Sequence, residues 1–203
     1  MHRGRPLLLL LLLLVAPGCD HSHPTEDEIV AVDPLPPNFS SPDSTLASLA
    51  RAIHYRSTTN YGLAFADTIT ENRGFHAVFD PNDILEWVSA GHSTYPADWR
   101  REDELAFFPN FVASYPDAFY DTYFTVDDSR GGKIVVGGPT HMEIWNMHYR
   151  VWAGTTPVAA GSAALTFETV GYSTQNEYKL TYWDDHRDTT NVRSWGKHRL
   201  EGR

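Results

Sequence analysis

The stretch HMEIWNMHYRV, residues 141–151, decides the fold class of this chain. Apolar and polar side chains alternate along it, which is typical of an antiparallel strand with one buried face. We predict that the buried face carries Trp145, Met147, Tyr149 and Val151, and that the other face carries Asn146, His148 and Arg150. His141 and His148 are seven residues apart and should then point to opposite faces. The sequence therefore predicts no metal site in this strand.

The segments around this strand continue the two-residue period. We predict further strands over residues 119–126, 134–136, 163–170 and 178–183, with turns at Gly131-Gly132 and over 171–177. Upstream of residue 119 the period is helical. Helices followed by a run of strands indicate an α+β fold, in which N-terminal helices pack on a strongly curved antiparallel sheet.

The first helix has a clear start. Ser41-Pro42-Asp43 supplies an N-cap, a proline at the first helical position and an early acid, and apolar residues then recur at helical spacing to about Arg56. Asn60 is predicted to cap a second, shorter helix. A third helix should open at Trp99, and Pro109 should end or kink it.

Between the second and third helices the sequence predicts a short strand and a loop. Residues 75–79 have the composition of a strand, and Asp80-Pro81-Asn82-Asp83 is a turn signal that closes it. We predict a loop-like insertion over residues 84–98.

The N-terminus predicts export. Arg3 and Arg5 precede eight leucines, and Ala16-Pro17-Gly18-Cys19 follows. A basic start, a short apolar stretch and small residues before a cleavage site make a secretory signal, and this stretch is too short to span a membrane. The segment ending at Cys19 resembles the bacterial lipobox, whose cysteine receives diacylglycerol. An ordinary signal peptide with an incidental cysteine is the alternative, but Cys19 is the only cysteine in the chain and so has no disulfide partner within it.

Three segments are predicted: a signal peptide over 1–18, a lipidated proline-rich tether over 19–41, and a domain over 42–203. His21 and His23 in the tether are too few to hold a metal ion firmly. Without the signal's two arginines, 14 basic residues remain against 26 acidic ones, a charge of about −12. Such a surface argues against nucleic-acid binding. We expect the protein in the cell envelope, attached to a membrane through its N-terminal lipid.

Several short motifs resemble the NTF2-like superfamily, also called SnoaL-like or ketosteroid-isomerase-like. The step Trp99-Arg100-Arg101-Glu102-Asp103-Glu104 resembles the family's entry into its third helix, and residues 178–185, YKLTYWDD, resemble its closing strand. Ser194-Trp195-Gly196 resembles a tail found in bacterial lipoproteins of this type. The resemblance implies a cone, in which a bent sheet wraps a long helix and leaves a pocket at the open end. Enzymes of the superfamily place an Asp or His there, while other members only bind or assemble.

No catalytic residue of the family can be transferred to this chain. Weak candidates from the residues themselves are Asp67 or Asp80 as a general base, with His76 or Tyr149 as partner. Structural roles are favoured instead, with Asp67 at a helix end and Asp80 at a turn. Because the chain has no zinc-protease, nucleophile-elbow, P-loop or dinucleotide-binding motif, we predict no cofactor.

The sequence thus favours a membrane-tethered lipoprotein with a non-catalytic domain, which binds either a small apolar ligand in the cone or a protein partner in the envelope. The alternative is a lyase or isomerase that uses an Asp/His pair in the cone. A pocket of several hundred cubic ångströms containing such a pair would favour the enzyme, whereas a cone packed with aromatic side chains would leave the interaction module.

Overall fold

The structure is a computed structural model, and it describes residues 33–68, 73–116, 119–170, 177–188 and 191–202. The predicted signal peptide, Cys19 and the His21/His23 pair lie outside these ranges. In the described part of the chain, no helix is both long and apolar enough to cross a membrane.

Two short helices open the domain. Helix α1, Pro42–His54, begins at Ser41, whose Oγ accepts a hydrogen bond from the Ser44 amide at 3.1 Å, as predicted. Helix α2, Thr58–Leu63, is capped by Ser57 and not by Asn60. The Asn60 amide donates to the Ser57 Oγ at 3.3 Å, so Asn60 is the third helical residue rather than the cap.

Seven strands form one sheet in the order β2-β1-β7-β6-β5-β3, and β4 also pairs with β5. Their bounds are β1 His76–Val78, β2 Trp99–Arg100, β3 Tyr120–Val126, β4 Lys133–Gly138, β5 His141–Ala153, β6 Thr156–Val170 and β7 Glu177–His186. All pairs are antiparallel except β1 with β7, which is parallel. The sheet is therefore mixed, which corrects the purely antiparallel sheet predicted from the sequence.

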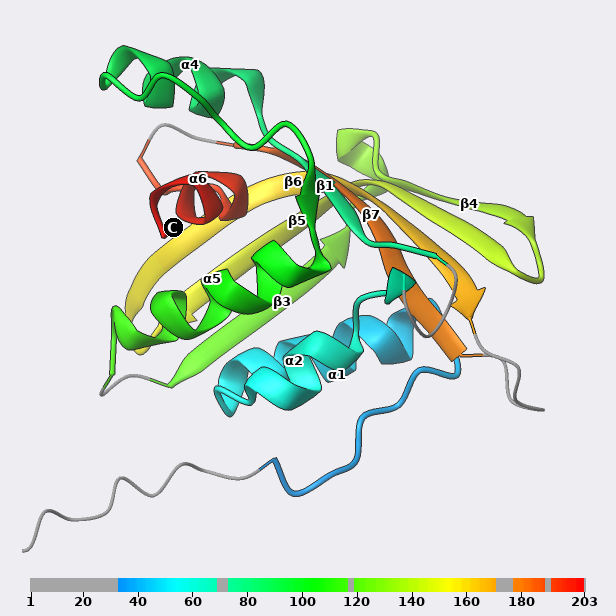
Figure 1. The fold of residues 1–203 in the computed structure, drawn as a ribbon. Helices are drawn as coiled ribbons and strands as arrows, with labels where there is room; N and C mark the ends of the chain where they lie inside the picture. Colours follow the sequence, from blue (N-terminus) through cyan, green and yellow to red (C-terminus); the bar gives the residue numbers. More distant parts are fainter. Residues whose placement is uncertain (1–32, 69–72, 117–118, 171–176, 189–190, 203) are drawn as a thin grey trace, which may run out of the picture.

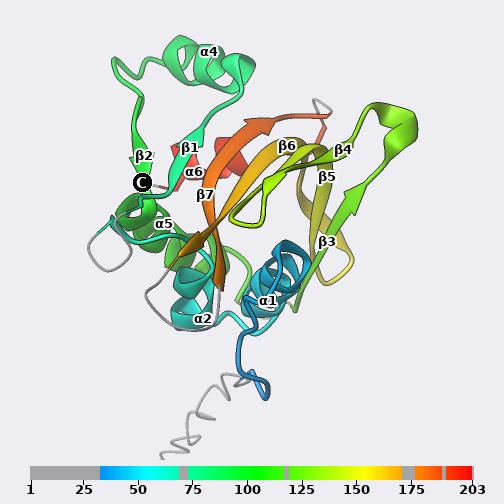
Figure 2. The ribbon, with the colours of Figure 1, turned by 90° about the vertical axis from the view of Figure 1, so that its right-hand side faces the viewer.

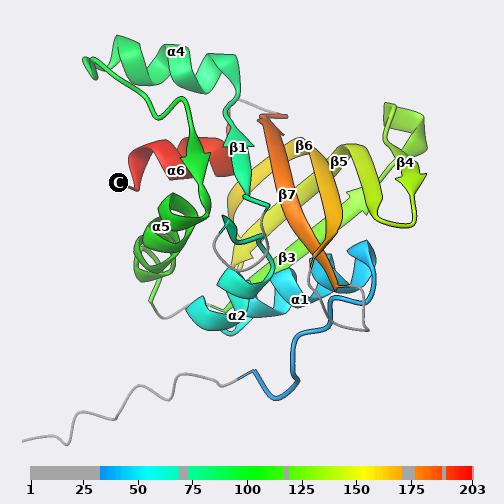
Figure 3. The ribbon, with the colours of Figure 1, turned by 45° about the vertical axis from the view of Figure 1, so that its right-hand side comes forward.

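The sheet curls around the helices, as Figures 1 and 3 show. Helices α1, α2, α5 (Arg101–Ala113) and α6 (Trp195–Glu201) lie on the side toward which the long strands β5 and β6 bend. The turned view in Figure 2 shows helix α4 (Pro81–Ser89) standing away from this body on the arm between β1 and β2. This is the predicted α+β arrangement, in which helices pack on a strongly curved sheet.

A bulge in β5 changes which side chains face the core. The register with β6 shifts between Ile144 and Met147, and Asn146 has a φ of 50°. Ile144 and Met147 are both buried, whereas Trp145 is 42% exposed. The extra residue shifts the alternation by one, so the prediction for Trp145 is wrong. The same shift places His141 and His148 on one side of the sheet, contrary to prediction.

Helices α4 and α5 also correct the sequence analysis. The predicted turn at Asp80 is the N-cap of α4, where the Asp80 carboxylate accepts from the Asn82 amide at 2.7 Å and Pro81 occupies the first turn. Aspartate followed by proline suits a turn and a helix start equally well, which explains the error. Helix α5 continues past Pro109 to Ala113, held by the buried rings of Phe108 and Phe111.

The last residues of the predicted tether pack on the domain. Asn38 exchanges hydrogen bonds with the Ser48 side chain of α1, and the Phe39 carbonyl accepts from the Tyr178 amide at 2.7 Å. The Phe39 ring is buried beneath the Lys179 ammonium, which lies 3.4 Å from the ring centroid. The packed part of the chain therefore begins before Ser41, because one aromatic side chain in this proline-rich stretch fixes it to the sheet.

Candidate functional site

The interior of the cone is filled. A cavity of about 10 Å³ remains there, enough for about one water molecule. Its lining is largely aromatic and aliphatic, and includes Tyr61, Phe124, Tyr149, Trp183 and Trp195. Ligand sites normally enclose about 300–1,000 Å³, so this cone has no space for a substrate or an apolar ligand in the described arrangement.

A buried carboxylate, Glu104, ties α5 to α2, β2 and α6. The Tyr61 hydroxyl, the indole N–H groups of Trp99 and Trp195, and the Arg199 guanidinium all donate to it. Arg199 binds it through Nε at 2.7 Å and Nη2 at 3.1 Å, and neither side chain is exposed. Burial, and then the negative charge of Glu104, raise the pKa of Tyr61 well above its usual value. Glu104 is therefore fully bound by its neighbours.

A second buried carboxylate, Asp185, joins β7 to β5 and α6. It accepts from the Tyr149 hydroxyl at 2.6 Å, from the Gly196 amide at 2.6 Å and from the Trp183 indole at 3.3 Å. The Tyr149 oxygen in turn accepts from the Trp195 amide at 2.7 Å. Burial raises the pKa of Asp185, and it also raises that of Tyr149 well above normal, with a further contribution from Asp185. Tyr149 thus anchors α6 to the sheet.

The structure does not bring the weak catalytic candidates together. Asp67 faces Arg101, with 3.4 Å between its Oδ2 and the Arg101 Nη1. His76 is half exposed and contacts Asp98 at 2.9 Å. Asp80 caps α4 and also accepts from the Arg187 amide at 3.1 Å. Each of these groups has a structural partner of its own, and Tyr149 lies apart from them in the core.

The histidines of β5 do not form a metal site. His141 contacts Glu143 at 3.0 Å and Glu168 at 3.4 Å, whereas His148 contacts Asp188 at 3.0 Å. In the part of the chain that the structure describes, no group of three or more His, Cys, Asp or Glu side chains has an arrangement that could hold a metal ion.

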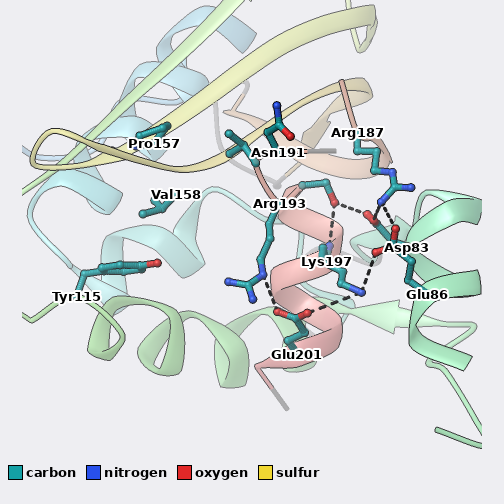
Figure 4. Close-up of a pocket in the computed structure, with 12 residues that line it drawn as sticks. Asp83, Glu86, Tyr115, Pro157, Val158, Arg187, Asn191, Arg193, Lys197 and Glu201 are labelled. Carbon is teal, nitrogen blue, oxygen red and sulfur yellow. Dashed lines mark hydrogen bonds and ion pairs between the residues drawn. The ribbon is translucent and has the colours of Figure 1, made fainter. Parts of the chain in front are cut away.

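A polar pocket of about 520 Å³ lies outside the cone, between α4, α6, Arg187 and the described residues 191–194 that precede α6 (Figure 4). The tip of the β5–β6 hairpin and the end of α5 complete its wall. We call it the α6 pocket. It is lined by Asp83, Glu86, Tyr115, Pro157, Val158, Arg187, Asn191, Val192, Arg193, Ser194, Lys197 and Glu201.

Charges of alternating sign cross the α6 pocket, as the dashed lines in Figure 4 show. Arg187 contacts Glu86 at 2.6 Å, and Lys197 lies 3.4 Å from Glu86 and 3.7 Å from Glu201. Arg193 contacts Glu201 at 3.0 Å. Together with Asp83, three acidic and three basic side chains line the pocket. The pocket is therefore balanced in charge on a chain whose net charge is −10.

The floor of the α6 pocket is fixed by Asp83, which is fully buried. It accepts a short hydrogen bond from the Ser194 hydroxyl and lies 3.5 Å from Arg187. Burial raises the pKa of Asp83, and the nearby Asp185 and Asp80 raise it further, while Ser194 and Arg187 act in the opposite direction. Because Ser194 also caps α6, its side chain connects Asp83 at the floor of the pocket to the start of that helix.

Comparison with known proteins gives matches to solved structures alone. No family model matches the sequence, and no curated protein matches it. An NTF2-like protein of unknown function from Shewanella oneidensis matches with 11% identity and a TM-score of 0.46, over 70% of this chain and 93% of that one. A proposed dehydratase of the NTF2-like family from Streptomyces avermitilis matches with 10% identity and a TM-score of 0.49, over 72% and 92%.

A further match is the beta subunit of a proposed aromatic-ring-hydroxylating dioxygenase from Novosphingobium aromaticivorans, with 14% identity and a TM-score of 0.47, over 78% of this chain and 94% of that one. At these identities and TM-scores, the activities of those proteins are not transferred to this chain.

Sequence reasoning missed the buried carboxylates and the α6 pocket. Glu104 belongs to the acidic run Glu102-Asp103-Glu104, in which nothing local marks the residue that turns inward. Asp185 ends the YKLTYWDD motif and follows another aspartate. Helix α6 was not predicted, although Ser194 before Trp195-Gly196 is a usable N-cap signal.

Proposed function

We propose that this protein is a membrane-tethered bacterial lipoprotein whose domain binds a protein partner in the cell envelope and performs no catalysis. The observation that carries this proposal is the filled cone, with about 10 Å³ free among aromatic side chains. The two carboxylates inside it, Glu104 and Asp185, accept hydrogen bonds from their neighbours and so are not presented to a substrate. The same filling argues against a small apolar ligand in the cone and leaves a protein partner.

The edge of the sheet at β4 is the surface best suited to such a partner. Strand β4 pairs with β5 on one side, and no other described strand pairs with it. Its sequence KIVVGG contains β-branched residues, a single charge and no proline, and its register with β5 shifts only near its end, between Val136 and Gly138. Charge and proline therefore do little to block pairing at this edge. Ile134 is 51% exposed and Val136 65% exposed. An extended segment of a partner can add to this edge, with main-chain hydrogen bonds supplying affinity and apolar contacts supplying selectivity.

Photo-crosslinking tests the partner and its place together. A benzoylphenylalanine at Val136 should give a discrete adduct in intact cells, because β4 is the proposed contact. The matched control is Leu85, which is 64% exposed and belongs to α4, a helix drawn apart from β4 in Figures 1 and 2. Equal adducts from both positions, or none from position 136, would contradict the proposal.

Replacing Cys19 by serine tests the lipid anchor. The Cys19→Ser variant should incorporate no labelled palmitate and should move from the membrane fraction to the soluble fraction, because acylation requires the thiol. A Ser22→Ala variant, changed three residues further along, should remain acylated. Palmitate incorporation that persists in Cys19→Ser would disprove the proposed attachment site.

A further inference from the structure

Of the basic side chains that the structure describes in the α6 pocket, Arg193 is the most exposed, and much of its hydrogen-bonding capacity is unused. Among the described residues, the Arg193 side chain has a single partner, Glu201, which lies 3.0 Å from its Nε. Its terminal nitrogens Nη1 and Nη2 donate no hydrogen bond to a described residue, and the side chain is 56% exposed. Lys197 differs, because it lies between two carboxylates and is largely buried.

Beside the Nη1 and Nη2 atoms of Arg193, the pocket is lined by the less polar side chains of Tyr115, Pro157 and Val158. In Figure 4 the Arg193 guanidinium is drawn between Glu201 and Tyr115, and Val158 and Pro157 lie above Tyr115. Tyr115 follows the C-cap of α5 and Val158 belongs to β6, so segments far apart in the sequence build the two sides of the pocket. The volume of about 520 Å³ is within the range of sites for small organic molecules.

We propose that the α6 pocket binds a carboxylate, held in a bidentate manner by Nη1 and Nη2 of Arg193, with the apolar body of the ligand against Tyr115 and Val158. The planar guanidinium matches a carboxylate in geometry, which a lysine ammonium does not. The lining carboxylates do not prevent this binding, because Glu86 and Glu201 are each neutralised by contacts with two basic side chains. The ligand carboxylate belongs either to a free organic acid or to the C-terminus of a peptide. The site is independent of the proposed β4 contact.

Ligand-observed NMR on the full chain in detergent tests the site with defined probes. Benzoylglycine, which carries a carboxylate and an aromatic body, should bind saturably, and its amide should bind at least about tenfold more weakly, because the charge-assisted hydrogen bonds are lost. Benzoylglycine binding should fall by a similar factor in Arg193→Gln. The control is Arg100→Gln, since Arg100 is also 56% exposed and paired with one carboxylate, Asp98.

The outcomes are distinct. The proposal is overturned if benzoylglycine and its amide bind equally well, or if Arg193→Gln binds benzoylglycine as tightly as the unchanged protein does. It is also overturned if neither benzoylglycine nor the peptide acid acetyl-Gly-Phe binds. Arg193→Gln should fold normally, because an ion pair as exposed as Arg193–Glu201 contributes little to stability, and an unchanged melting curve verifies this. Acetyl-Gly-Phe with a free carboxylate, compared with its amide, identifies the source: tighter binding than benzoylglycine assigns a peptide terminus, and equal or weaker binding assigns a small acid.

Discussion

Glu104→Ala is expected to destabilise the domain by about 3–5 kcal/mol, because it leaves the Arg199 guanidinium buried without its counter-charge. Arg199 is completely buried, and the Glu104 carboxylate is the acceptor for both its Nε and its Nη2. The substitution also removes the acceptor of the Trp99 indole. Urea denaturation of the purified protein, followed by tryptophan fluorescence, measures the loss.

The neighbouring Glu102 is the control for this prediction. It lies in the same turn of α5 and is exposed, so Glu102→Ala should change the free energy of unfolding by no more than about 0.5 kcal/mol. A double variant, Glu104→Leu with Arg199→Met, should recover only part of the stability. It removes the unpaired buried charge, but the Tyr61, Trp99 and Trp195 donors still lack their acceptor. If Glu104→Ala costs no more than Glu102→Ala, the proposed central position of Glu104 in the core is wrong.

Trp195→Ala is the second large effect, also expected at about 3–5 kcal/mol, because it removes a buried indole from the centre of the core. The Trp195 ring contacts the rings of Phe107, Phe111 and Trp183, with centroids 4.6–6.5 Å apart. Its indole N–H also donates to Glu104 at 3.2 Å. Since Trp195 begins α6, the variant should loosen that helix, and hydrogen exchange of residues 195–201 should report it.

Trp145 provides the matched control, because it is the same residue type on the outer side of β5. It is 42% exposed, and its indole donates to the neighbouring Glu143 at 2.7 Å. Trp145→Ala should therefore cost about 1 kcal/mol or less. Similar losses for the two tryptophans would contradict the bulge in β5, since the sequence alternation without a bulge buries Trp145.

The sequence predicted most elements because their signals are local. Ser41-Pro42-Asp43 marks the start of α1, and alternating residues mark β3, β5, β6 and β7. The errors occur where one local pattern fits two structures. Asp80-Pro81 suits a turn or a helix cap, and Pro109 weakens a helix that buried phenylalanines nevertheless hold together. Propensity is a weak prior that tertiary packing overrides.

The candidate site was much less predictable than the fold. Of the weak candidates, Tyr149 lies in the core as a hydrogen-bonding anchor, while Asp67 and His76 have separate partners near the surface. The α6 pocket combines α4, α6, the end of α5 and a β-hairpin, and Arg193 and Tyr115 are far apart in the sequence. No spacing rule along the chain can reveal a site of that kind.

The sequence by itself determined that N-terminal helices precede a run of strands, and hence the α+β class, because hydrophobic period and capping residues act over a few neighbours. It also supplied the prediction of an anchor at Cys19. Only the tertiary structure decided that the cone is filled, that Glu104 rather than Glu102 turns inward, and that a polar pocket forms beside α6. These features depend on contacts between distant segments. The pairing of β5 with β6 likewise includes a one-residue bulge at Asn146, which reverses the predicted faces of the β5 side chains that precede it.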